Sequence, residues 1–120
     1  MCVRVDANGH GDGAGTHVSV FVYLMRGEYD SQLVWPFRGD ITIQLVNHNN
    51  DQYYCETVPY DDAAGSSTCN RVTSGERSGN GRGYHKFITH AKVESSTNTK
   101  RYIVNDCLTF RITKIVVHSI

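Results

Sequence analysis

Residues 16–26 read THVSVFVYLMR and form the strongest run of alternating apolar side chains in the chain. One face of this run carries Val18, Val20, Val22 and Leu24. A period of two residues is typical of a β-strand and not of a helix. Phe21 and Tyr23 lie on the opposite face, so both sides of this strand are expected to be partly covered.

Shorter runs of the same kind recur along the chain, separated by turn-forming residues. They cover residues 3–5, 40–47, 53–58, 84–93 and 108–117. No segment shows a sustained apolar period of 3.6 residues, and only residues 27–33 (GEYDSQL) are suited to a single helical turn or a turn-rich loop. Many short strands without helices predict an all-β sandwich or barrel over residues 1–120, as one domain.

The composition excludes several classes of function. The 120 residues contain 12 Lys and Arg and 12 Asp and Glu, so the formal net charge is zero. A protein that binds nucleic acid through its backbone needs a clustered basic excess, which this chain lacks. No apolar run reaches the ~20 residues of a membrane span, and residues 1–6 do not resemble a secretion signal.

Four cysteines, Cys2, Cys55, Cys69 and Cys107, are too far apart in sequence to form a zinc knuckle. Dispersed cysteines in a chain of this size favour reduced thiols in a cytosolic setting. Cys2 and Cys107 stand in strand-like runs, where we expect buried packing. A Cys2–Cys107 or Cys55–Cys69 disulfide would instead favour a secreted sandwich.

The glycine-rich segment 8–15 (NGHGDGAG) admits three interpretations. A phosphate-binding loop would be followed by a helix, whereas a strand follows here. A calcium loop would need a bidentate Glu where His17 stands. A turn between two strands requires only glycines at positive φ, and we favour it.

The remaining motifs have structural explanations as well. The six histidines, His10, His17, His48, His85, His90 and His118, show no metal-ligand spacing, and no metal or cofactor is expected. His85 and His90 would face opposite sides of one strand. The cluster Trp35-Pro36-Phe37 is expected to anchor the core at a turn. No Gly-x-Ser-x-Gly motif of a hydrolase occurs, and no enzymatic activity is expected.

Several motifs, taken in order, resemble a TRAF-C or MATH domain. They are Cys2-Val3-Arg4-Val5, Asn8-Gly9, residues 15–21 (GTHVSVF), residues 25–30 (MRGEYD), Leu33 with Trp35-Pro36-Phe37, Gly83-Tyr84, Phe87-Ile88 with His90, and Tyr102-Ile103 with Asn105-Asp106. Each motif is weak alone, but together they keep the family order over nearly the whole chain. The resemblance implies an antiparallel β-sandwich of TRAF-C/MATH type, with about seven strands in this chain.

The resemblance also implies a function. Such domains are intracellular signalling adaptors in TNF receptor signalling, and they hold receptor or adaptor tails as short extended peptides. The peptide adds as a strand to a sheet edge, here near residues 84–90. The family is usually trimeric, with help from a preceding coiled coil. Binding to nucleic acid and insertion into membranes are not expected, and the expected location is cytoplasmic.

The site residues follow from the same resemblance. They are Arg4, Asp6, His10, Phe21, Ser66, Ser67, Thr68, Cys69, Arg82, Gly83 and Tyr84. Arg4 matches the arginine that meets a ligand acid, Phe21 and Tyr84 match aromatics of the groove, and residues 66–68 match a serine finger. Asp6, His10, Cys69 and Arg82 depart from the residues common in the family. Arg4, Arg82 and Lys86 together suggest an acidic peptide, and Asp6 is expected to compete for Arg4.

The chain begins after the family's first strand, so we expect an N-terminally incomplete domain with an unpaired edge around residues 108–117. Exposed edges favour association or instability. Two other functions stay open. One is a MATH domain that recruits substrates for a ubiquitin-ligase adaptor or a deubiquitinase. The other is an enzyme or a lectin-like secreted sandwich, because sandwich folds host unrelated functions.

Overall fold

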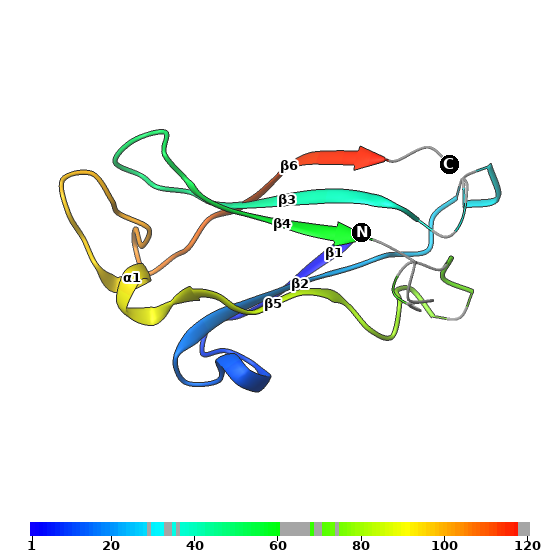
Figure 1. The fold of residues 1–120 in the computed structure, drawn as a ribbon, viewed down its shortest axis with the longest axis horizontal. Coiled ribbons are helices and arrows are strands. Elements are labelled where there is room, and N and C mark those ends of the chain that lie inside the picture. Colours follow the sequence, from blue (N-terminus) through cyan, green and yellow to red (C-terminus); the bar gives the residue numbers. More distant parts are fainter. Residues whose placement is uncertain are drawn as a thin grey trace.

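The computed structural model describes residues 1–28, 30–32, 35, 37–60, 68, 71–73 and 75–117. Within these residues there are six strands: β1 (Cys2–Asp6), β2 (His17–Tyr23), β3 (Gly39–Leu45), β4 (Tyr54–Tyr60), β5 (Arg82–Thr89) and β6 (Phe110–Val117). Two antiparallel sheets, with strand orders β1-β2-β5 and β4-β3-β6, lie face to face (Figure 1). The prediction of an all-β antiparallel sandwich is confirmed.

The core lies between the two central strands, because each of these carries apolar residues at alternate positions. Val18, Val20 and Val22 of β2 are at most 2% exposed, and Ile41, Ile43 and Leu45 of β3 are fully buried. Full burial of one such side chain stabilises a fold by roughly 1.5–3 kcal/mol. The outer face of β2 is buried as well, including Ser19, Phe21 and Tyr23. The covered second face predicted from the sequence is therefore confirmed.

The glycine-rich segment packs over the outer face of β2 and β5. It forms the 3-10 turn η1 (Gly11–Gly13), and Gly9, Gly11 and Gly15 have φ values of 83°, 59° and 79°. A Cβ atom on Gly13 would collide with the carbonyl oxygen of His85, so only glycine fits this approach. The turn interpretation with several positive φ angles is confirmed.

A buried hydroxyl joins this turn to the sheet. The register of β2 and β5 shifts between Val18 and Val20, where Ser19 of β2 stands opposite residues 85–87 in a bulge of β5. The Ser19 hydroxyl donates to the carbonyl of His85 at 2.6 Å and accepts from the amide of His10 at 2.8 Å. One side chain thus fixes both residues, which lie 75 positions apart in sequence.

The predicted strand over residues 84–93 is wrong for its last four residues, 90–93. β5 ends at Thr89, and residues His90–Glu94 form the short helix α1. The Thr89 hydroxyl caps this helix by accepting from the amide of Lys92 at 3.2 Å, and Val93 is buried against the core. The expectation of no helix, and of His85 and His90 on one strand, fails because of this local cap.

Two smaller expectations concern residues 27–37. A single 3-10 turn, η2 (Asp30–Gln32), forms where one helical turn was predicted. Trp35 packs partly buried against the core, and its indole nitrogen donates to the carbonyl of Asp30 at 2.8 Å. Phe37 contacts Tyr60 edge-on at 5.1 Å between ring centroids. The anchoring role of Trp35 and Phe37 is confirmed, while Pro36 lies outside the described residues.

The cysteines differ partly from expectation. Cys2, Cys55 and Cys107 are free thiols, and Cys69 lies outside the described residues. Cys107 is exposed, so the prediction of buried packing is wrong there. It closes a two-residue turn with Val104 instead, in which Asn105 and Asp106 adopt φ values of 52° and 60°.

The sandwich has open rims. Within the described residues, β6 pairs only with β3 and β1 pairs only with β2, so the predicted unpaired edge at β6 is present. Val3 and Val5 share the inward face of β2's valines, yet they are 36% and 39% exposed. Ile112 and Ile115 of β6 are 39% and 53% exposed. Association through this rim remains a prediction.

Candidate functional site

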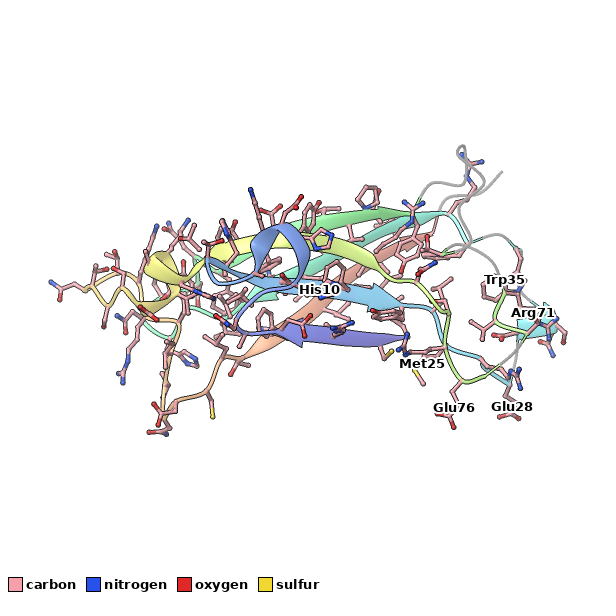
Figure 2. All side chains as sticks on the ribbon, turned by 90° about the horizontal axis from the view of Figure 1, so that it is seen from below. His10, Met25, Glu28, Trp35, Arg71 and Glu76 are labelled. Carbon is pink, nitrogen blue, oxygen red and sulfur yellow. The ribbon has the colours of Figure 1, made fainter. Side chains whose placement is uncertain are left out.

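A cleft of about 310 Å³ lies on the outer face of the β1-β2-β5 sheet. It is lined by Arg4, His10, Phe21, Tyr23, Gly79, Asn80, Gly81 and His85. Arg4 of β1 pairs with Phe21 of β2, and Phe21 pairs with Gly83 of β5. Paired residues of an antiparallel sheet share a face, so this row points outward, away from the valine core. In Figure 2, His10 lies over this face beside the η1 turn.

Aromatic rings line one part of the cleft. The ring centroids of His10 and His85 are 5.8 Å apart, with 21° between the planes. Phe21 meets His85 edge-on at 5.0 Å and His10 edge-on at 6.1 Å. Phe21 is nearly buried because it stands on the central strand. These three rings give the cleft an apolar floor with imidazole edges.

The other part of the cleft is cationic. Nε of Arg4 lies 3.1 Å from Oδ2 of Asp6, which is the predicted competition for this guanidinium. A hydrogen bond to the Tyr23 side chain and the charge of Asp6 raise the pKa of Arg4, so it stays charged. The guanidinium of Arg77 lies over the Tyr23 ring, 4.3 Å from its centroid. An exposed ion pair is weak, and Arg4 therefore keeps the capacity to bind a ligand acid.

A second cavity, of about 420 Å³, lies along the rim between β5 and β4. It is lined by Phe21, Val58, Pro59, Gly81, Arg82, Gly83, Tyr84 and His85. Phe21, Gly81 and His85 line both cavities, so the two adjoin at the outer face of β5.

The polar side chains of this rim bind β4. Arg82 donates from Nη1 to the carbonyl of Pro59 at 2.9 Å and from Nε to the hydroxyl of Thr68 at 2.6 Å. The Tyr84 hydroxyl donates to the carbonyl of Thr57. Burial raises the pKa of Tyr84, with a smaller contribution from Glu56, so the phenol remains a donor. Arg82 and Tyr84 thus fasten β5 to β4.

The predicted site residues fall into two groups. Arg4, Asp6, His10 and Phe21 are brought together on the outer face, and Gly83 lies beside Phe21. Thr68, Arg82 and Tyr84 lie on the β4 side of β5. Ser66, Ser67 and Cys69 lie outside the described residues.

One docking site that uses both Arg4 and Tyr84 stays a prediction. The Arg4 guanidinium and the Tyr84 phenol line two adjoining cavities, which share Phe21, Gly81 and His85. The reason is the two-residue period of β5, in which Tyr84 faces the opposite side from Gly83. The aromatic side chain of β5 that lines the outer-face cleft is therefore His85 and not Tyr84. Sequence reasoning missed His85, Tyr23 and Asn80, although His85 stands two residues after Gly83 and so shares its face.

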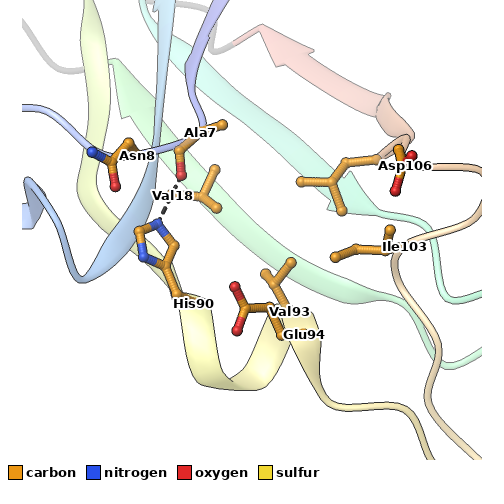
Figure 3. A pocket seen from close by; sticks show the side chains of 9 residues that line it. Ala7, Asn8, Val18, His90, Val93, Glu94, Ile103 and Asp106 are labelled. Atoms are coloured by element: carbon orange, nitrogen blue, oxygen red, sulfur yellow. Dashed lines mark hydrogen bonds between the residues drawn. The ribbon is translucent and has the colours of Figure 1, made fainter.

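A third cavity, of about 360 Å³, lies between α1, the end of β1 and the segment before β6 (Figure 3). Val18, Val93, Ile103 and Leu108 contribute apolar surface, and Glu94 and Asp106 are among its polar residues. Nε2 of His90 lies 2.7 Å from the carbonyl oxygen of Ala7. Of the predicted site residues that the structure describes, none lines this cavity.

Two further observations concern the described residues alone. They contain no group of three or more His, Cys, Asp or Glu side chains placed to hold a metal ion. They also contain no helix that is long and apolar enough to span a bilayer.

Two facing antiparallel sheets, with a cleft on the outer face beside an edge strand, define the class of this protein as a β-sandwich domain with a rim cleft. The chain belongs to the TRAF/meprin MATH domain family, whose family model matches residues 1–111. The resemblance seen in the sequence is confirmed.

Three relatives illustrate the similarity. TNF receptor-associated factor 5 of Mus musculus is 37% identical over 113 residues, which cover 93% of this chain and 19% of that protein. TNF receptor-associated factor 1 of Mus musculus is 47% identical over 53 residues, covering 44% of this chain and 13% of that protein. The solved structure of Notothenia coriiceps TRAF5 matches with a TM-score of 0.80 at 28% identity, over 98% of this chain and 55% of that one. This chain thus spans about a fifth of the length of a curated relative such as the first.

Proposed function

We propose that this domain is a non-catalytic signalling adaptor module of the cytoplasm, which binds short extended segments of receptors or adaptors. The ligand adds as a strand along the free edge of β5 and places a side chain in the outer-face cleft. The observation that carries this proposal is the position of the cleft against an edge strand. The names of the relatives, TNF receptor-associated factors, support receptor-linked signalling as the setting.

The geometry of β5 favours strand addition. Within the described residues this strand pairs only with β2, so its other edge has backbone groups available to a ligand. Gly83 carries no side chain over the outer face, and Arg82 and Tyr84 turn toward β4. Backbone hydrogen bonds then supply affinity, and the cleft selects among ligand side chains.

Arg4 is the residue suited to select an acidic side chain. Its guanidinium presents a planar fork of donors that matches a carboxylate. It stands at the cationic end of the cleft, and its side chain is 47% exposed. A ligand acid can replace Asp6 as its partner without desolvating a deeply buried pair.

A nine-residue peptide array tests this function, with the central residue fixed as Glu, Gln or Lys and the other positions randomised. We expect Glu-centred peptides to bind best, and Arg4→Ala to reduce their binding about tenfold through loss of a charge-assisted contact. Arg101→Ala is the matched control, because Arg101 is exposed and lines neither cavity beside β5. Absence of binding to every peptide, or equal binding by both variants, would refute the proposal.

The proposed adaptor role includes a contribution to trimerisation of the full-length protein. Sedimentation of this chain alone, and of the chain fused to a trimeric coiled coil, tests this part. A fused trimer that binds immobilised peptide no more strongly than the single chain would contradict a role for multivalency.

A further inference from the structure

His10 and His85 meet on the wall of the cleft, although they belong to the glycine-rich loop and to β5. Their rings stack at 5.8 Å, and both residues are exposed. Ser19 holds both backbones, and Phe21 supports both rings from below. The pair is therefore built into the fold and borders the same cleft as Arg4.

The hydrogen bond of His85 fixes its tautomer. Nδ1 of His85 lies 2.9 Å from the carbonyl oxygen of His10, and a carbonyl oxygen only accepts, so Nδ1 carries the hydrogen. In the neutral ring Nε2 is then an acceptor, which repels an anion. Protonation converts Nε2 into a donor. Among the described residues, none makes a hydrogen bond to Nε2 of His85 or to the ring nitrogens of His10.

The other charged groups around the pair nearly balance. They are Arg4 and Asp6 from β1, Asp12 from η1, Lys86 from β5 and Arg77 over Tyr23. On this face β2 adds two titratable groups, His17 and Tyr23, and His17 is left unchanged in every variant below. The loop residues Gly79, Asn80 and Gly81 add no titratable side chain. With three cations and two carboxylates present, the charge state of the two histidines decides how strongly this region attracts an anion.

We infer that His10 and His85 make the cleft a pH-dependent receptor for an acidic peptide side chain, held between Arg4 and the imidazole pair. This inference rests on the proposed function. Two charged imidazoles in a stack repel each other, and a bound anion relieves that repulsion. Ligand binding and proton uptake are thus coupled, and a Glu-centred peptide binds more tightly at pH 5.5 than at pH 7.5.

The expected size of the effect follows from one added charge near the ligand acid. At about 6 Å and an effective dielectric constant between the protein-surface and water values, the gain is about fivefold in affinity. The carboxylate of a Glu side chain stays ionised at pH 5.5, because its usual pKa is about 4.3. The change with pH therefore comes from the protein side of the contact.

The experiment repeats the nine-residue array at pH 7.5 and pH 5.5, with a phosphoserine-centred set beside the Glu, Gln and Lys sets. The variants are His10→Asn, His85→Asn and the double variant. Asn keeps an amide donor near the position of Nδ1 but does not titrate. His48→Asn is the matched control, since His48 is exposed in the turn between β3 and β4, outside both cavities beside β5.

The expected result is a Glu-to-Gln preference that rises about fivefold on acidification in the wild type and in His48→Asn, and that stays constant in the double variant. A preference that rises equally in the double variant would overturn the inference. A preference independent of pH in the wild type would also overturn it, while leaving the proposed function intact. The ligand class is read at pH 7.5, where phosphoserine carries nearly two negative charges. Tighter binding of phosphoserine than of Glu peptides identifies a phosphorylated ligand, whereas equal or weaker binding identifies Asp or Glu. No binding in any set refutes the proposed function itself.

Discussion

Tyr84 gives a direct test of whether the β5 rim fastens the two sheets or contacts the ligand. Its hydroxyl donates to the carbonyl of Thr57 on β4, across the gap between the sheets. Tyr84→Phe removes that hydrogen bond and keeps the ring. A neutral hydrogen bond contributes about 0.5–1.5 kcal/mol net. Thr57 is exposed and water can reach its carbonyl, so we expect a loss at the lower end, about 0.5–1 kcal/mol.

Urea unfolding followed by fluorescence measures this loss, and thermal unfolding should show a decrease in Tm of about 2–5 °C. Tyr53→Phe is the matched control, because no described residue bonds to the Tyr53 hydroxyl, and its stability should stay within about 0.3 kcal/mol of the wild type. Binding of Glu-centred peptides should be unchanged in both variants. Unaltered stability of Tyr84→Phe together with a tenfold loss of binding would show that the phenol serves the ligand, and our assignment of this rim would be wrong.

Two further predictions follow from other parts of the fold. The pKa of Tyr54 is raised to about 12 by burial and by its hydrogen bond to Glu56, so the folded state keeps this proton where the unfolded chain loses it. The free energy of unfolding should fall between about pH 10 and pH 12, by less than the limit of about 1.4 kcal/mol per pH unit for one proton because the phenol is partly solvated, and Tyr54→Phe should flatten the curve. Gly13→Ala should destabilise the fold by about 2 kcal/mol or more, because the new methyl group meets the carbonyl of His85. It should also abolish the contact between the rings of His10 and His85, visible as altered imidazole resonances; native-like resonances would contradict the close approach seen here.

Alternation in the sequence was sufficient to predict the central strands. In β2 and β3 every second residue is a branched apolar one. Only one register between neighbouring strands buries all of these side chains, so the alternation determines the pairing. The alternation rule failed at residues 90–94, because the segment HAKVE has no strong preference for either strand or helix. There the Thr89 cap and the burial of Val93 decide for a helical turn. A residue can cap a helix only if the preceding strand ends at that residue. The alternation of apolar residues does not predict where the strand ends.

The candidate site was only half predictable for a related reason. Arg4, His10 and Phe21 were identified from motifs, and the register of β1 and β2 places them together. Tyr84 was assigned to the ligand because it matches an aromatic of the family's groove, and its side chain bonds to β4 and lines the neighbouring cavity, because successive residues of a strand face opposite sides. The meeting of His10 with His85 depends on the β5 bulge opposite Ser19 and on the close contact of Gly13 with the His85 carbonyl, and both join segments that are far apart in sequence.

The fastening of β5 to β4 has a consequence for stoichiometry. The carbonyls of Thr57 and Pro59, through which a guest strand could join β4, already accept from Tyr84 and Arg82. On this side of the sandwich, the protein's own side chains occupy the edge of β4. Within the described residues, the edge of β5 is then the one place here where a guest strand can pair. If β5 binds a tail as proposed, one copy of the domain engages one tail at a time here, and durable attachment to a clustered partner then comes from assembling several copies.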